Sequence, residues 1–122
     1  MKIHLCTGLP RSGSTILLNI LQQNPRIFTS STCAVPRLLN DLLTKTKVKE
    51  EFISMEQVKA DKAMYGFARG AAYGWYEGLT DKPVAFSKSR YWSNLFHLFP
   101  ESKILVTVRD LRDVVESFEK LE

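Results

Sequence analysis

The chain has 122 residues, of which 44% are hydrophobic and 25% are charged, and its formal net charge at pH 7 is +4. These values describe an ordinary globular protein with one domain and one core. The mild positive charge suits a small anionic ligand, and it equally suits a solvated surface. No basic tract with interleaved aromatic residues is present, which argues against a nucleic-acid partner.

The cysteines and the N-terminus exclude several other classes of protein. Cys6 and Cys33 are the only cysteines, so the sequence offers neither a disulfide framework nor a zinc-ligand spacing. Cys6 lies in an apolar run and is expected to be a buried, inert thiol. The N-terminus lacks the zones of a signal peptide, and no stretch reaches the roughly 18 apolar residues that a membrane span needs. We therefore expect no cysteine-based zinc site, no membrane span and a cytoplasmic location.

The first half of the chain predicts a strand followed by helices. Residues 2–8 predict a short buried strand, and residues 12–25 a helix. Residues 26–36 are interpreted as a polar connection, and residues 36–52 as a second helix. The apolar stripe of the first helix is expected to contain Ile16, Leu17, Ile20 and Leu21. The apolar face of the second is expected to contain Leu38, Leu39, Leu42 and Leu43.

A longer helix is predicted over residues 54–79, where Ser54 and Gln57 resemble a capping box. Glycine recurs along it at every fourth position, at Gly66, Gly70, Gly74 and Gly78. This spacing leaves a bare seam on a helix and costs roughly 1 kcal/mol per glycine relative to alanine. Tight packing against another element is the favoured interpretation, and a ligand-facing seam is the alternative.

The remaining residues predict two more strands, at 82–89 and 102–110, each followed by a helix, at 90–100 and 111–122. The run from Ile104 to Val108 is almost unbroken and rich in β-branched residues, as expected of a parallel strand covered on both faces. Alternating strands and helices predict an α/β fold with a parallel β-sheet flanked by helices. Three strands make a narrow sheet, so we expect residues 1–122 to be a single domain that forms the N-terminal part of a longer one.

The first motif reads GLPRSGST and follows the first strand. Gly8, Gly13 and Thr15 match the phosphate loop G-x-x-x-x-G-K-[ST], but Ser14 replaces the lysine and Arg11 adds a cation inside the loop. Backbone N–H groups of such a loop surround an anion at the positive end of the next helix. Without the lysine, the loop is expected to bind magnesium-bound β,γ-phosphates poorly, whereas it can still bind a terminal phosphate or sulfate well. A simple glycine turn is the alternative.

The second motif reads VRDLRDVVESF. Arg109 lies where the strand should end, and Ser117 follows eight residues later, about two helical turns on. Ligands of open α/β sheets bind beyond the carboxyl ends of the strands, so Arg11 and Arg109 are predicted to serve two anion sites on one crevice. The alternative is a set of salt bridges at a helix start, formed by Arg109, Asp110, Arg112 and Asp113.

Together the two motifs resemble those of the sulfotransferase family. The first looks like the 5′-phosphosulfate loop of these enzymes, and the second matches their 3′-phosphate site in the register of Arg109, Asp113 and Ser117. The resemblance implies a three-layer, P-loop nucleotide-binding-like architecture. It also implies metal-independent transfer of a sulfuryl group from 3′-phosphoadenosine 5′-phosphosulfate to a hydroxyl or amine acceptor. The residues that would bind the donor are Arg11, Ser12, Gly13, Ser14, Thr15, Arg109 and Ser117.

The resemblance does not supply a general base. Cytosolic members place Lys-Thr-His after the second strand, where this chain has Lys88, Ser89 and Arg90. Lys88 can still contact the transferring group, and with Arg11 it is the catalytic candidate. Tyrosyl-protein members use a glutamate after the first helix, where this chain has Ser30, Ser31 and Thr32. Both histidines, His4 and His97, are expected to have structural roles.

Two other functions remain open from the sequence. One is a P-loop small-molecule kinase in which Thr15 and Asp110 hold magnesium and ATP is the donor. The other is a non-catalytic nucleotide-binding remnant that has lost the base. The aromatic residues Trp75, Tyr76, Tyr91 and Trp92 are interpreted as core rather than as an acceptor pocket. The sequence indicates neither the acceptor nor an oligomeric state.

Overall fold

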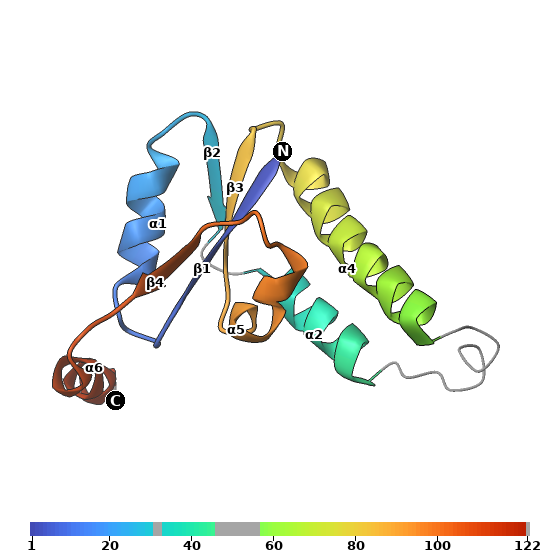
Figure 1. Ribbon diagram of the computed structural model, residues 1–122. Helices are drawn as coiled ribbons and strands as arrows, with labels where there is room; N and C mark the ends of the chain where they lie inside the picture. The colour runs from blue at the N-terminus through green and yellow to red at the C-terminus, as the bar shows by residue number, and fades with distance from the viewer. Residues whose placement is uncertain (31–32, 46–56, 122) are drawn as a thin grey trace.

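The computed structural model describes residues 1–30, 33–45 and 57–121, which form a parallel sheet between two layers of helices (Figure 1). The sheet has the order β2-β3-β1-β4, and all its pairings are parallel. The strands are β1 (Lys2–Gly8), β2 (Ile27–Ser30), β3 (Val84–Lys88) and β4 (Ile104–Thr107). The helices are α1 (Ser14–Gln22), α2 (Val35–Lys45), α4 (Gln57–Leu79), α5 (Trp92–Leu95), the 3-10 turn η1 (Phe96–Leu98) and α6 (Leu111–Glu119). The predicted α/β fold is confirmed.

The sheet has four strands rather than the three that the sequence predicts. The segment interpreted as a polar connection, 26–36, contains β2, which pairs with β3 from Ile27 opposite Val84 to Ser30 opposite Ser87. Thr29 is buried in this strand, and its hydroxyl donates to the backbone O of Leu18 at 3.3 Å. Because this hydrogen bond satisfies the hydroxyl, a strand of mixed polarity can be buried beneath α1.

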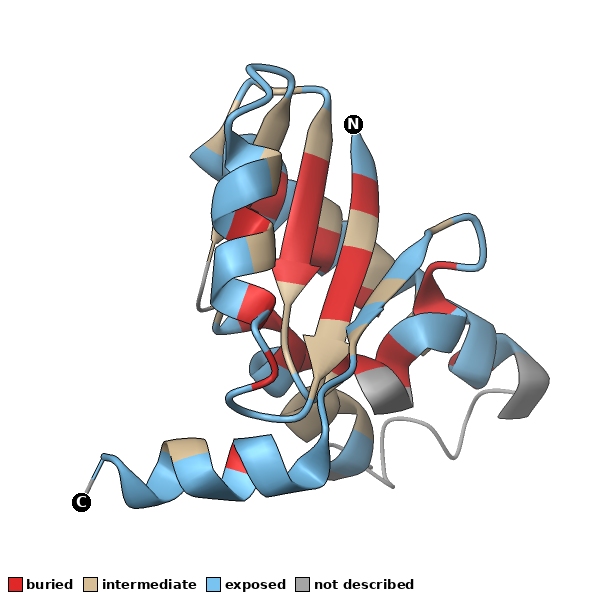
Figure 2. Cartoon of the chain, turned by 90° about the vertical axis from the view of Figure 1, so that its left-hand side faces the viewer, coloured by how far each residue is buried: buried red, intermediate tan, exposed pale blue. Residues whose placement is uncertain are grey.

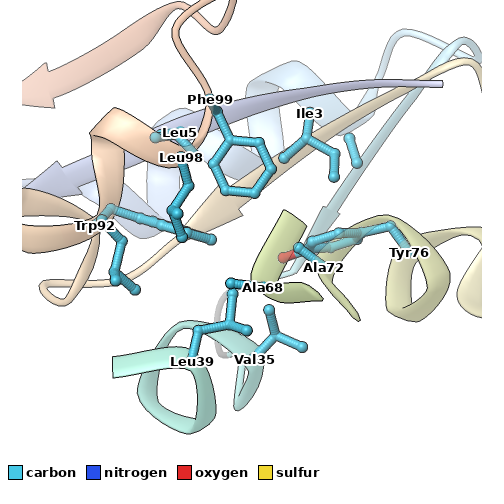
Figure 3. Packing of buried hydrophobic residues seen from close by; sticks show 12 residues of the cluster. Ile3, Leu5, Val35, Leu39, Ala68, Ala72, Tyr76, Trp92, Leu98 and Phe99 are labelled. Atoms are coloured by element: carbon cyan, nitrogen blue, oxygen red, sulfur yellow. The ribbon is translucent and has the colours of Figure 1, made fainter. Parts of the chain in front are cut away.

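The larger core fills the space between the sheet and helices α2, α4 and α5 (Figure 3). Tyr76 and Trp92 are fully buried there, and both donate hydrogen bonds to the Ser87 hydroxyl, that of Trp92 being 3.0 Å long. The core interpretation is confirmed for these two aromatic residues, whereas Trp75 is 41% exposed. The members of this cluster are Ile3, Leu5, Val35, Leu39, Ala68, Ala72, Tyr76, Ala85, Trp92, Leu95, Leu98 and Phe99.

The smaller core lies on the opposite face of the sheet, beneath α1. Leu18 packs there against Cys6 and Phe86, and the predicted stripe of α1 is therefore partly wrong. Ile16 and Ile20 are 67% and 57% exposed. Since α1 carries apolar side chains on two sides, its sequence alone does not identify the side that faces the sheet. The prediction for α2 fails for the same reason. Leu38 is predicted to face the core but is exposed, whereas Val35 and Leu39 are buried.

Strand β4 and helix α6 form the exposed end of the molecule (Figure 2). The prediction that this strand is covered on both faces is wrong. Leu105 packs against the smaller core, but Val106 and Val108 are 58% and 87% exposed. Within the described residues β4 pairs with β1 alone, so it is an edge strand. An unbroken apolar run therefore does not distinguish an edge strand from a central one.

The glycine seam of α4 faces open space. A Cβ atom added at Gly66, Gly70, Gly74 or Gly78 would meet no atom within 4 Å among the described residues. The predicted tight packing at the glycines is therefore wrong. The described residues also bring no ligand-binding element to this side of α4. The close approach of α4 to the core depends instead on Ala68 and Ala72, which are fully buried. No helix in the described ranges is both long and apolar enough to cross a membrane.

Two predictions fall on residues that the structure does not describe. These are the capping box that begins at Ser54 and the part of the 36–52 helix beyond Lys45. The positions Ser31 and Thr32, which the resemblance compares with the glutamate of tyrosyl-protein sulfotransferases, also lie outside the described residues. The last helix was expected over 111–122, and α6 ends at Glu119.

Candidate functional site

The loop from β1 to α1 bends sharply through residues with positive φ. Arg11 and Gly13 have φ angles of 64° and 94°, and Gly13 is the N-cap of α1. Gly8, at 156°, begins the loop. A Cβ atom at Gly8 would collide with the hydroxyl and the backbone oxygen of Thr107, so this position requires glycine. A left-handed conformation at the non-glycine Arg11 costs roughly 1–2 kcal/mol, so other contacts must hold this loop in place.

The N-terminus of α1 presents backbone donors to the loop. Gly13 provides no side-chain cap, and the first backbone hydrogen bond of the helix runs from Leu17 N–H to Gly13 O at 3.1 Å. The N–H groups of Ser14, Thr15 and Ile16 precede this bond and have no partner within the helix. Together with the helix dipole, these donors can hold an anion, as the first motif predicts.

The second motif contacts the loop directly. Arg11 Nε donates to Ser117 Oγ at 2.9 Å, and Arg109 Nη1 donates to the backbone O of Arg11 at 3.0 Å. Residues about a hundred positions apart therefore meet at the carboxyl edge of the sheet, as predicted. Both arginines are exposed, so they lie on an open edge rather than in the crevice that the sequence suggested.

Lys88, the last residue of β3, also reaches the loop. Its Nζ donates to Thr15 Oγ1 at 3.3 Å, on the first turn of α1. A lysine from a neighbouring strand thus stands close to the helix start, where the phosphate-loop lysine is replaced by Ser14. Arg90, at the position of the histidine in cytosolic sulfotransferases, lies over the ring of Tyr91 at 5.3 Å from its centroid.

Ser12 turns into the protein rather than outward. Its side chain is buried, and its hydroxyl shares a hydrogen bond with the hydroxyl of Thr107 at the end of β4. Sequence reasoning assigned Ser12 to the donor and missed Thr107. The available signal was the single hydroxyl residue, Thr107, in the otherwise aliphatic run ILVTV.

The alternative of salt bridges at the start of α6 explains only part of the second motif. Asp110 is the N-cap: it accepts a hydrogen bond from Arg112 N–H at 2.8 Å and pairs with the Arg112 guanidinium at 3.4 Å. The backbone hydrogen bond and the guanidinium hold the pKa of Asp110 below its usual value. Arg109 instead donates to the loop carbonyl, so helix capping does not account for it.

Cys6 is buried, as predicted, and neither histidine contacts the loop in the described part of the chain. His4 Nδ1 accepts from Lys103 N–H at 3.1 Å, and burial, with help from Lys103, lowers the pKa of His4. His97 is exposed in η1, with its ring centroid 6.4 Å from that of Tyr65. Cys6 is fully buried, and burial raises the pKa of its thiol. Among the described residues, no group of three or more His, Cys, Asp or Glu could hold a metal ion.

A four-stranded parallel sheet whose first strand leads through a glycine-bounded loop into a helix defines a P-loop-like α/β protein. The comparison with protein families is more specific. The model described as "Sulfotransferase family" matches residues 5–122, and the chain therefore belongs to the sulfotransferase family. This assigns it to the transferases that move sulfuryl groups. No curated protein matches the sequence significantly.

Proposed function

We propose that the chain binds 3′-phosphoadenosine 5′-phosphosulfate and transfers its sulfuryl group to a hydroxyl or amine acceptor. One observation carries this proposal: the guanidinium of Arg11 is 2.9 Å from the Ser117 hydroxyl. Through this contact, a side chain of the loop assigned to the phosphosulfate touches a residue assigned to the 3′-phosphate. A nucleotide with groups on both its 5′ and 3′ carbons requires two sites at such short range.

The residues divide naturally between the two ends of the donor. The backbone of Gly13 and the first turn of α1, at Ser14 and Thr15, would hold the 5′-phosphosulfate together with Arg11 and the loop backbone at Ser12. Arg109 and Ser117 would bind the 3′-phosphate. The guanidinium of Arg109 uses one of its five donors on the loop carbonyl, which leaves the others for a phosphate.

In the proposed transfer, the acceptor oxygen or nitrogen attacks the sulfur atom in line with the bond to the 5′-phosphate. That bond breaks, its electron pair stays on the bridging oxygen, and adenosine 3′,5′-bisphosphate leaves. Lys88 and Arg11 would stabilise the charge that builds on the bridging oxygen, since Lys88 reaches the first turn of α1 and Arg11 belongs to the loop itself. The acceptor proton passes to solvent water as the sulfate ester or sulfamate forms. We assign no base to remove it, because both histidines lie elsewhere.

The kinase alternative is less well supported. It needs the carboxylate of Asp110 for magnesium, yet this carboxylate caps α6 and pairs with Arg112. The hydroxyl of Thr15 is likewise engaged, by Lys88.

Calorimetric titration tests the proposal. We expect adenosine 3′,5′-bisphosphate to bind equally well with EDTA and with magnesium, and more tightly than ATP with magnesium. A preference for ATP with magnesium would instead identify a kinase. Donor binding without sulfuryl transfer to any of a panel of phenols, sugars, amines and tyrosine peptides would identify a non-catalytic remnant.

A further inference from the structure

We infer that Thr107 is a positioning residue that holds the loop in the conformation that receives the 5′ end of the donor. This inference rests on the proposed function, because it assigns the loop to that end. It concerns a residue outside both motifs, on the strand that precedes the second one.

Thr107 contacts the loop at two points, Gly8 and Ser12, from the end of β4. Thr107 is the last residue of β4 and pairs with Gly8 in the register of the sheet. Its hydroxyl shares a hydrogen bond with Ser12 Oγ. A side chain at Gly8 would occupy the space of this hydroxyl, so the glycine makes the contact possible. Thr107 shares the sheet face of Leu105, two residues earlier, which packs beneath α1.

Ser12 is the point at which the loop needs support. It lies between Arg11 and Gly13, which both have positive φ. Its N–H donates to Leu9 O at 3.2 Å within the loop, and its hydroxyl connects the loop to β4. The direction of the Arg11 side chain and of the first N–H groups of α1 follows from the backbone on either side of Ser12. Fixing Ser12 therefore fixes the donors for the phosphosulfate.

The end of β4 holds two consecutive loop residues. Thr107 holds the side chain of Ser12, and Arg109 holds the carbonyl of Arg11. The Arg109 guanidinium is also assigned to the 3′-phosphate, whereas Thr107 has no such assignment. Loss of the Thr107 hydroxyl should therefore affect the 5′ end of a nucleotide selectively.

The experiment compares Thr107→Val with Thr107→Ser, using three nucleotides as probes. We expect Thr107→Val to bind 5′-AMP and adenosine 3′,5′-bisphosphate about fivefold more weakly, the equivalent of ~1 kcal/mol for one neutral hydrogen bond. Binding of 3′-AMP should change less than twofold. Thr107→Ser keeps the hydroxyl and should restore 5′ binding. Thr7→Val is the matched control, since Thr7 lies on the neighbouring strand, on the sheet face of Leu5.

Equal losses for all three nucleotides, or no loss in Thr107→Val, would overturn the inference. Hydrogen exchange in the free protein gives a readout that needs no nucleotide. Amides of residues 9–15 should exchange about fivefold faster in Thr107→Val than in Thr7→Val, and equal rates would also overturn it. If the unsubstituted chain binds no bisphosphate while the exchange difference is present, the proposed function fails and the support of the loop by Thr107 stands.

Discussion

The two faces of the sheet differ in what they contribute. The face covered by α2, α4 and α5 buries a large aromatic and aliphatic cluster. The face beneath α1 buries a smaller hydrophobic cluster of Cys6, Leu18 and Phe86 with partly buried neighbours. The loop that precedes α1 contacts Ser117 and Arg109 at the sheet edge. We therefore expect substitutions in the large cluster to affect stability, and substitutions at the sheet edge to affect the proposed nucleotide binding.

The largest expected effect is on stability, from the deep core. Trp92→Ala should lower the free energy of unfolding by ~3–5 kcal/mol, because the indole fills the cluster and its N–H donates to the buried Ser87 hydroxyl. Urea unfolding measures this loss. Trp75→Ala is the matched control, since Trp75 is 41% exposed, and it should cost far less. Similar losses for the two variants would contradict the conclusion that the buried cluster carries the stability.

The next effect is on binding, at the sheet edge. Arg109→Ala should weaken binding of adenosine 3′,5′-bisphosphate by about tenfold or more, since charge-assisted contacts contribute roughly 1.5–3 kcal/mol. Binding of AMP should fall less, because Arg109 is assigned to the 3′-phosphate directly and supports the 5′ loop only through the carbonyl of Arg11. Calorimetric titration compares the two ligands. Arg112→Ala is the control. It also removes one positive charge, but from an exposed arginine that pairs with Asp110. Equal losses for both nucleotides would remove the assignment.

A smaller effect concerns a buried polar contact within the large core. The Tyr76 hydroxyl donates to Ser87 Oγ and lies 3.0 Å from Cys33 Sγ, and burial raises the pKa of this tyrosine. Tyr76→Phe removes the hydroxyl but keeps the ring, so it should cost ~1 kcal/mol of stability. Thermal unfolding measures the change, with Tyr91→Phe at the partly exposed neighbour of Arg90 as the control. Nucleotide affinity should stay unchanged. A change in affinity would show that the large core and the sheet edge are coupled, against the division between them.

The smallest effect is a dependence of stability on pH. The Arg69 guanidinium pairs with Glu101 at 2.8 Å and lowers the pKa of this carboxyl to about 2. Because the folded pKa lies below the unfolded one, the stabilisation is present above about pH 4.5 and is lost as the pH falls toward 2. The pair is exposed, so the effect should be small. Urea midpoints between pH 7 and 2.5 should fall less in Glu101→Gln than in Glu77→Gln; parallel curves would contradict this.

The sequence predicts most of the fold and the approach of the two motifs at one edge of the sheet. The phosphate-type loop, the alternation of strands and helices, and the meeting of Arg11 with Arg109 at one edge all follow from local spacing and the geometry of parallel sheets. These predictions succeed because each depends on a pattern within a short segment of the sequence. The rest depends on contacts between distant residues.

The errors share that physical origin. The four residues of β2 are recognised as a strand only through pairing with β3 and burial beneath α1. Thr107 looks like any strand residue until Gly8 and Ser12 meet it across the sheet edge. The glycines of α4 suggest a close contact, yet only the arrangement in space shows that the alanines make it.

The register of β1 has a consequence for the order of events during synthesis. This strand pairs on one side with Val84–Lys88 and on the other with Ile104–Thr107. It leaves the ribosome long before either partner exists, and its apolar residues Ile3 and Leu5 have no permanent cover until then. Closing such long loops is slow. Although β1 is one of the two inner strands of the finished sheet, it is the strand that waits longest for its neighbours, and the nascent chain is exposed to wrong pairing during that interval.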